Sequence, residues 1–110
     1  MMYVDFTAGN KDYKLRLTTK DIVSLERHLG CNPLAIFGNG DILPTLTAMV
    51  QVLHASLQSM NHGISIADAY GIFDDYLADG HVMTDFVHVI VEVYKVSGLI
   101  KYDEADTEKN

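Results

Sequence analysis

The fold is decided by the stretch Tyr13-Lys14-Leu15-Arg16-Leu17-Thr18-Thr19-Lys20-Asp21-Ile22-Val23-Ser24-Leu25-Glu26-Arg27-His28-Leu29-Gly30. Its first five residues alternate between apolar and basic side chains, as in a strand with one buried face. Thr18 then suits a helix N-cap, and Asp21 follows three residues later, near the positive end of the helix dipole. An apolar stripe and a closing glycine complete the helical pattern. The stretch therefore predicts a strand that leads into a capped amphipathic helix, which begins at residue 18 or 19 and ends at residue 29.

A second strand is expected just upstream, over residues 3–6, where Tyr3, Val4 and Phe6 favour extended backbone. Residues 9–12, Gly-Asn-Lys-Asp, are typical of a turn. The two strands should therefore form a hairpin. Because a two-stranded hairpin is only marginally stable alone, it should pack on the helix that follows.

Downstream, residues 32–38 predict one short helical turn, with Asn32 as cap and Pro33 in the first helical position. A long helix is predicted over about residues 42–61 because apolar residues recur there at spacings of three and four. That stripe consists of Leu43, Leu46, Val50, Leu53, Leu57 and Met60. Ser65 should cap a further helix, in which Gly71 suggests a point of close packing. The apolar stripe of this helix is Ile66, Tyr70, Phe73 and Leu77.

The segment 83–96 is ambiguous. Its valines at 87, 89, 91 and 93 alternate as in a strand. A length of about 14 residues without a breaker instead favours a helix, which Gly98 would close. We predict a helix, apolar nearly all round and hence central in the fold or in an oligomer.

Together these elements predict an α+β fold, mainly α, with an N-terminal β-hairpin packed on a bundle of about four helices. A chain of 110 residues supports one domain, which we place at residues 1–101. Residues 102–110 are acidic and have no apolar period, so we expect a disordered tail there.

The composition limits the partners and the cellular location that can be expected. The net charge is −7, with 8 Lys and Arg against 15 Asp and Glu, which argues against nucleic acid and against an anionic membrane surface as partners. The single cysteine, Cys31, allows no intrachain disulfide and suits a reducing cytoplasm. The N-terminal residues lack a signal-peptide layout, and no segment is apolar enough to span a membrane. We therefore expect a soluble, cytoplasmic protein.

Signals for catalysis are weak. His81, Asp85 and His88 have the i, i+4, i+7 spacing of metal ligands on a helix, but surface residues at a helix start are the more common case. The carboxylates within residues 74–79 indicate a solvated helix face rather than a general acid and base. No catalytic triad, phosphate-binding loop or dinucleotide fingerprint is present. We expect no enzyme, cofactor or metal, and we keep a metal-binding protein that uses these three residues as an alternative.

A resemblance adds to this interpretation. The helix ending Leu25-Glu26-Arg27-His28-Leu29-Gly30, the following Asn32-Pro33-Leu34 and the long Leu-rich helix resemble the tail assembly chaperones of long-tailed (siphovirus-type) bacteriophages and prophages. The likeness runs from about residue 13 to residue 99. It implies a mainly helical protein of the bacterial host cytoplasm that forms homo-oligomers. Such a protein coats the tape-measure protein before the tail tube polymerises, and it is absent from the finished particle.

The resemblance also implies candidate contacts. Apolar helix faces would bind the tape-measure protein or further copies. We choose as candidates Leu46, Val50, Leu53, Leu57, Ile90 and Val93, with a role in the core as the alternative.

Many such chaperones are made in two lengths by a ribosomal frameshift. The ending Glu108-Lys109-Asn110 permits the codons GAA-AAA-AAC, which contain the slippery heptamer A-AAA-AAC. A longer form of the protein and the tail tube protein are thus further possible partners. A small helical DNA-binding regulator is the remaining alternative, although no helix has clustered Arg and Lys.

Overall fold

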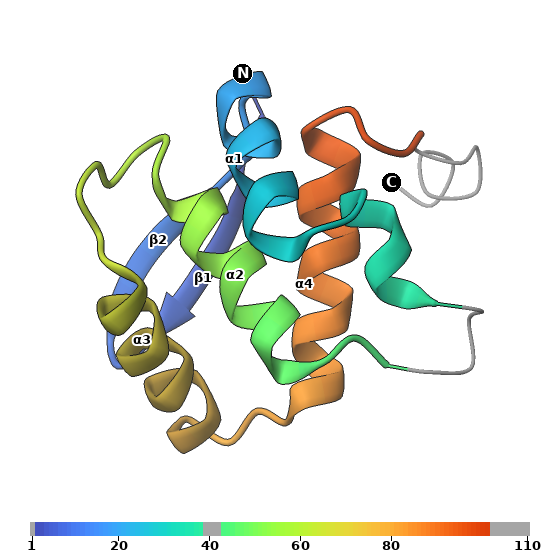
Figure 1. The fold of residues 1–110 in the computed structure, drawn as a ribbon. Coiled ribbons are helices and arrows are strands. Elements are labelled where there is room, and N and C mark those ends of the chain that lie inside the picture. The colour runs from blue at the N-terminus through green and yellow to red at the C-terminus, as the bar shows by residue number, and fades with distance from the viewer. Residues whose placement is uncertain (1, 39–42, 102–110) are drawn as a thin grey trace.

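The computed structural model describes residues 2–38 and 43–101, which form a hairpin followed by helices (Figure 1). The elements are β1 (Val4–Ala8), β2 (Lys11–Leu15), α1 (Thr19–Leu29), the 3₁₀ turn η1 (Pro33–Phe37), α2 (Leu46–Leu57), α3 (Ile66–Ala78) and α4 (Met83–Val96). This confirms the α+β, mainly α class. The predicted tail, residues 102–110, lies outside the described residues.

The hairpin is confirmed, with a tighter turn than the sequence predicted. The antiparallel register pairs Phe6 with Tyr13 and Ala8 with Lys11. Only Gly9 and Asn10 lie between the strands, at φ values of 58° and 64°. Two successive residues with positive φ are the mark of a type I′ turn, whose twist matches that of the strands. Consequently β1 extends to residue 8 and β2 starts at residue 11.

The helix starts follow local capping chemistry. The Thr18 hydroxyl accepts a hydrogen bond from the amide of Asp21 at 3.2 Å, and the Asp21 carboxylate accepts one from the Thr18 amide at 3.0 Å. Ser65 and Asp68 form the same reciprocal pair before α3. Each pair satisfies two amides that a helix start would otherwise leave without a partner. Both predicted caps are therefore confirmed.

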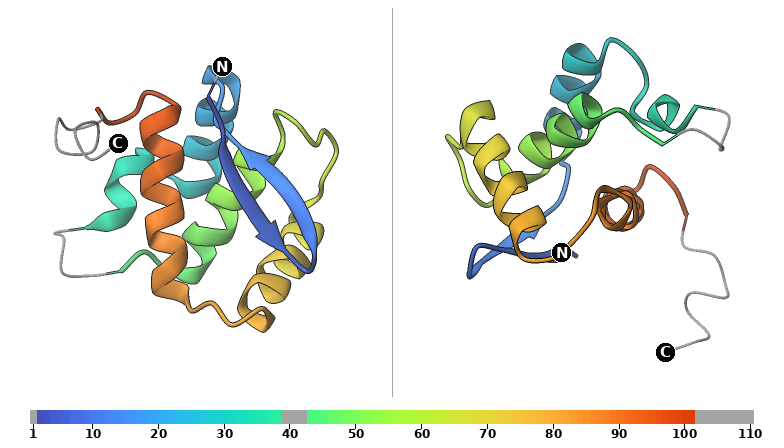
Figure 2. Two further views of the ribbon diagram at one scale, coloured as in Figure 1. Left: turned by 180° about the vertical axis from the view of Figure 1, so that it is seen from behind. Right: turned by 90° about the horizontal axis from the view of Figure 1, so that it is seen from below.

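Helix α2 is the centre of the fold. It packs against α1, α3, α4 and β2, and Figures 1 and 2 show it between α1 on one side and the hairpin on the other. It is shorter than the predicted 42–61 at both ends, since it ends at Leu57. It begins at Leu46 because Thr45 is the cap, with its hydroxyl accepting from the Ala48 amide at 3.1 Å. Eight of its twelve residues are buried, including Ser56, whose hydroxyl donates to the Val52 carbonyl at 2.7 Å. Of the described helices, α2 and not α4 is thus the one enclosed on nearly all sides.

The segment 83–96 is helical, as predicted over the strand alternative. One face of α4 is buried and carries Phe86, Ile90, Val93 and Tyr94. The Tyr94 hydroxyl donates to the Pro33 carbonyl at 2.9 Å, and the Tyr94 ring meets Phe37 edge-on at 5.9 Å. Tyr94 thereby fastens η1 to the last helix.

The buried face of α3 differs from the predicted stripe. It consists of Ala69, Ile72, Phe73 and Tyr76, whereas Tyr70 is exposed. The reason is an aromatic cluster, in which Tyr76 packs on Phe6 of the hairpin at 4.9 Å and on Phe86 of α4 at 5.8 Å. The predicted close packing at Gly71 is wrong, since a Cβ there would meet no atom within 4 Å.

Polar contacts join segments that are distant in sequence. The Arg16 guanidinium donates from Nη1 to the carbonyls of Met2 at 2.8 Å and Val96 at 2.7 Å. Next to it, the Leu17 amide donates to the Ser97 hydroxyl at 2.9 Å. These bonds tie the junction of β2 and α1 to the end of α4. Arg16 is therefore half-buried, not on an open strand face as the alternation predicted.

Candidate functional site

The structure divides the six residues chosen as candidates for partner contact. Five of them, Val50, Leu53, Leu57, Ile90 and Val93, lie in the hydrophobic core of the single chain. Leu46, the first residue of α2, is 45% exposed. In this fold the core alternative therefore applies to the five buried residues, and Leu46 alone of the six is exposed.

The starts of α2 and α4 carry four exposed large apolar side chains. The N-terminal ends of these two helices lie side by side in Figures 1 and 2, and the helices pack against each other. Leu43 and Leu46 at the start of α2 are 52% and 45% exposed, and Val82 and Met83 at the start of α4 are 57% and 36% exposed. We call these four residues the apolar end. Exposed apolar side chains on neighbouring helix starts are a candidate contact surface, because contact sites are enriched in such groups.

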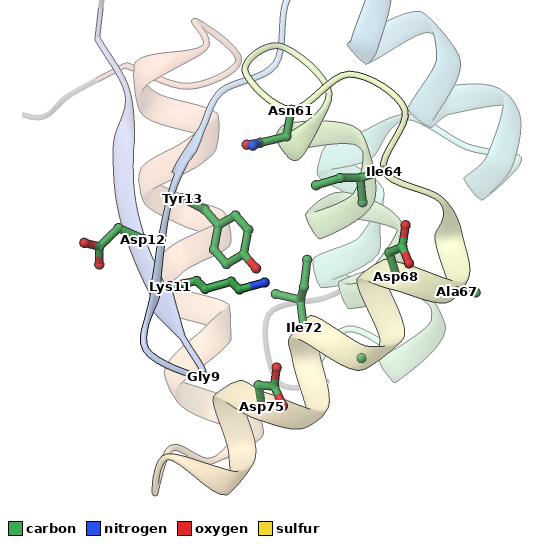
Figure 3. A pocket seen from close by; sticks show the side chains of 11 residues that line it. Gly9, Lys11, Asp12, Tyr13, Asn61, Ile64, Ala67, Asp68, Ile72 and Asp75 are labelled. Carbon is green, nitrogen blue, oxygen red and sulfur yellow. The ribbon is translucent and has the colours of Figure 1, made fainter.

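A groove lies between β2 and α3 (Figure 3). Its volume is about 810 Å³, and its lining includes Lys11, Tyr13, Ile64, Ile72 and Asp75. In Figure 3 the side chains of Lys11 and Tyr13 point from β2 toward α3. The lining mixes apolar and charged groups and opens to solvent, so it does not resemble the enclosed apolar pocket of a typical small-molecule site.

The proposed metal ligands do not converge. His81 stacks on Tyr76 with ring centroids 4.2 Å apart, and its Nδ1 lies 3.5 Å from the Asp85 carboxylate. That carboxylate also accepts a hydrogen bond from the Val82 amide at 3.0 Å, which is a capping role at the start of α4. Among residues 2–38 and 43–101, no three His, Cys, Asp or Glu side chains come together as metal ligands would. Asp85 thus has a structural role of its own.

One carboxylate near the end of α3 has a role that the sequence did not reveal. Asp79 accepts a hydrogen bond from the Gly9 amide at 2.9 Å, across 70 residues of sequence. A Cβ on Gly9 would lie only 2.8 Å from the Asp75 carboxylate, so the turn approaches α3 closely. Asp79 holds the hairpin turn against α3 through this bond, and nothing in the spacing of the acidic residues could have shown it.

Two further observations bear on the kind of partner. Helices α3 and α4 carry one basic residue, Lys95, against five acidic ones, which does not favour a DNA recognition helix. None of the described helices combines the length and the apolar character that crossing a bilayer requires.

The fold and these surfaces define a class: a small hairpin-and-helix protein with an apolar end and an open groove, and without converging metal ligands in the part of the chain that the structure describes. Residues 4–110 match the model of a family of unknown function, DUF6096, and the chain belongs to this family. No curated protein and no solved structure matches the chain significantly.

Proposed function

We propose that this protein is a non-enzymatic tail assembly chaperone of a long-tailed bacteriophage or prophage. It associates with copies of itself in the host cytoplasm and binds the tape-measure protein before the tail tube polymerises. The observation that carries the proposal is the apolar end, because a chaperone of this kind needs an exposed apolar surface that a partner helix can cover. The resemblance of residues 25–34 and of the order of the elements to these chaperones supports the proposal independently.

The apolar end suits an apolar helix as partner. The exposed residues come from two neighbouring helix starts, so a partner helix could contact both. They are Leu43, Leu46, Val82 and Met83. Methionine adapts its shape to varied surfaces, which fits a partner with a long and repetitive apolar stripe. Fully burying one such side chain contributes about 1.5–3 kcal/mol, and these four are already about half covered, so covering the rest of each contributes about 1 kcal/mol. A contact of this strength could still be displaced when the tail tube polymerises.

The net charge of the protein supports its proposed role in keeping the tape-measure protein soluble. A net charge of −7 on 110 residues makes copies that coat a partner repel other complexes, which keeps the assembly soluble. An apolar helical protein without such a coat tends to aggregate.

The test is co-expression with the long helical protein that this proposal predicts to be encoded downstream of this gene, the expected tape-measure protein. We expect the tape-measure protein to be insoluble alone and to elute with this protein as one large soluble complex. Replacing Leu46 and Val82 by serine should reduce the soluble fraction of the tape-measure protein, whereas Tyr70→Ser should not. Tyr70 is the matched control because it is also a large side chain, 49% exposed, but lies on α3.

Circular dichroism of each variant shows whether the fold is retained. If the tape-measure protein stays insoluble with the unaltered chaperone, or if the double variant solubilises it equally well, the proposal fails at its central step.

A further inference from the structure

The outer edge of β2 carries backbone groups without partners. In a hairpin with a two-residue turn, the pair that flanks the turn is hydrogen-bonded, and bonded pairs then recur at every second residue. Lys11, Tyr13 and Leu15 therefore bond to β1, while the amides and carbonyls of Asp12 and Lys14 point outward. The Arg16 amide shows the same outward direction, because it donates to the Ser56 carbonyl at 3.1 Å. No described residue bonds the outward groups of Asp12 and Lys14.

This open edge borders the groove. Figure 3 shows the Tyr13 and Lys11 side chains on the groove side of β2 and Asp12 on the opposite side. Tyr13 is half-buried, and Asp12 and Lys14 are exposed. The edge thus offers two donors and two acceptors over three residues, as well as an aromatic side chain that an added strand would cover. An edge of this kind is a template for one more strand.

Charge decides which strand fits. If a second copy of β2 pairs antiparallel with the first, three registers place outward groups opposite one another. One sets Asp12 against Asp12, another sets Lys14 against Lys14, and both oppose like charges, which destabilise a strand pair. The third sets Asp12 against Lys14 and Lys14 against Asp12, with Tyr13 opposite Tyr13. The Lys14–Lys14 register would also set Asp12 against Arg16, but the Arg16 amide is already bonded to the Ser56 carbonyl. Of the three registers, the third alone opposes no like charges, and it forms two bonded pairs with four hydrogen bonds.

We propose that two copies of this protein associate through the outer edges of β2, in the register that places Asp12 of each copy opposite Lys14 of the other. The contact gives the self-association in the proposed function a place in the fold. It joins two hairpins into one four-stranded sheet, in the order β1-β2-β2-β1.

On the exposed face of the hairpin, Lys14 and Asp12 each have a polar partner on β1. Lys14 lies opposite Asp5 of β1, and its Nζ is 2.6 Å from the Asp5 carboxylate. Asp12 lies opposite Thr7, whose hydroxyl donates to the Asp12 carboxylate at 2.7 Å. In the joined sheet, Lys14 would stand between Asp5 of its own copy and Asp12 of the other, so that unlike charges alternate across the strands. The charged edge also discourages pairing with unrelated strands.

The test exchanges the two charges. Light scattering over a concentration series gives the dissociation constant of the dimer. D12K alone opposes lysine to lysine and K14D alone opposes aspartate to aspartate, so each should raise that constant about tenfold or more. The double variant D12K/K14D opposes unlike charges again and should restore association. A mixture of the two single variants should associate with each other more tightly than either does with itself.

Matched controls change the same charges elsewhere. D74K and K20D alter exposed residues on α3 and α1 and should leave the dimer unchanged. Disulfide trapping checks the register directly, because opposite residues of a non-bonded antiparallel pair have Cα atoms about 4.5 Å apart, within disulfide reach. In a C31S background, Y13C should form a disulfide dimer on mild oxidation and K20C should not.

A protein that stays monomeric at high concentration overturns the inference. Equal association of all the charge variants, or equal trapping of Y13C and K20C, also does so. The test of the β2 contact and the test of the chaperone role can fail independently. A monomer that still solubilises the tape-measure protein refutes the β2 contact alone, and a β2-paired dimer that leaves it insoluble refutes the chaperone role alone.

Discussion

Replacing Gly71 by alanine should stabilise the protein, which is a demanding test of how α3 is packed. Gly71 lies inside α3, its backbone is helical, and a Cβ there would point into open space. Alanine is favoured over glycine inside a helix by about 0.8–1.0 kcal/mol, partly because glycine leaves the unfolded chain more freedom. With no clash to offset that gain, the free energy of unfolding should rise by about 0.5–1 kcal/mol. For a domain of this size, the midpoint temperature should rise by about 2–4 °C.

Two other glycines provide the contrast for the same chemical change. Gly63→Ala also adds a Cβ in open space, but at φ +85°, and should cost about 1–2 kcal/mol because the left-handed region disfavours a side chain. Gly9→Ala has φ +58° and adds a contact of 2.8 Å with the Asp75 carboxylate, so it should cost more than Gly63→Ala.

Urea unfolding at one protein concentration measures all three variants, and the order of stability should be Gly71→Ala, unaltered protein, Gly63→Ala, Gly9→Ala. A clear loss of stability for Gly71→Ala would mean that another part of the protein packs on this face of α3, and would refute the reasoning.

Three further predictions concern the core and the apolar end. Leu53→Ala should lower the free energy of unfolding by about 2–5 kcal/mol because Leu53 is fully buried, whereas Leu46→Ala should change it by less than about 0.5 kcal/mol; denaturant titration separates the two. Tyr94→Phe should cost about 1–3 kcal/mol in the same assay, since it leaves the buried Pro33 carbonyl without its donor. Burial raises the pKa of the Tyr94 hydroxyl above its ordinary value of 10.0. Above about pH 10 the unfolded chain therefore loses this proton while the folded chain keeps it. The free energy of unfolding then falls by up to about 1.4 kcal/mol per pH unit. Unfolding measured at a series of pH values should show a smaller fall for Tyr94→Phe.

Local chemistry explains what could be predicted from the sequence. Helix starts at Thr18 and Ser65 depend on residues three positions apart, so their caps are visible in the sequence. The helical state of residues 83–96 follows from length and from the absence of a breaker. These features need no knowledge of the rest of the fold.

Features that depend on a distant neighbour could not be predicted. Helix α3 offers two plausible apolar faces, and the contacts of Tyr76 with Phe6 and Phe86 decide between them. Likewise, the stripe along α2 is regular from residue 43 to residue 60, but its middle is enclosed by other elements while Leu43 and Met60 at its ends are exposed. Periodicity shows that a face is apolar, and only the tertiary arrangement shows what covers it. The open edge of β2 also became visible only once the length of the turn was known.

The bonds from Arg16 to the carbonyls of Met2 and Val96 have a consequence for how the protein is made on the ribosome. The hairpin is synthesised before α4, but Arg16 finds one acceptor, and Phe6 one aromatic neighbour, only in α4. A two-stranded hairpin alone is marginal, so the hairpin gains these stabilising contacts only once α4 has been translated. Folding of this domain therefore depends on contacts of high sequence separation, which slows it relative to a bundle of local contacts. Until α4 has been made, the apolar faces of the nascent hairpin and of α2 are open to contact with other proteins.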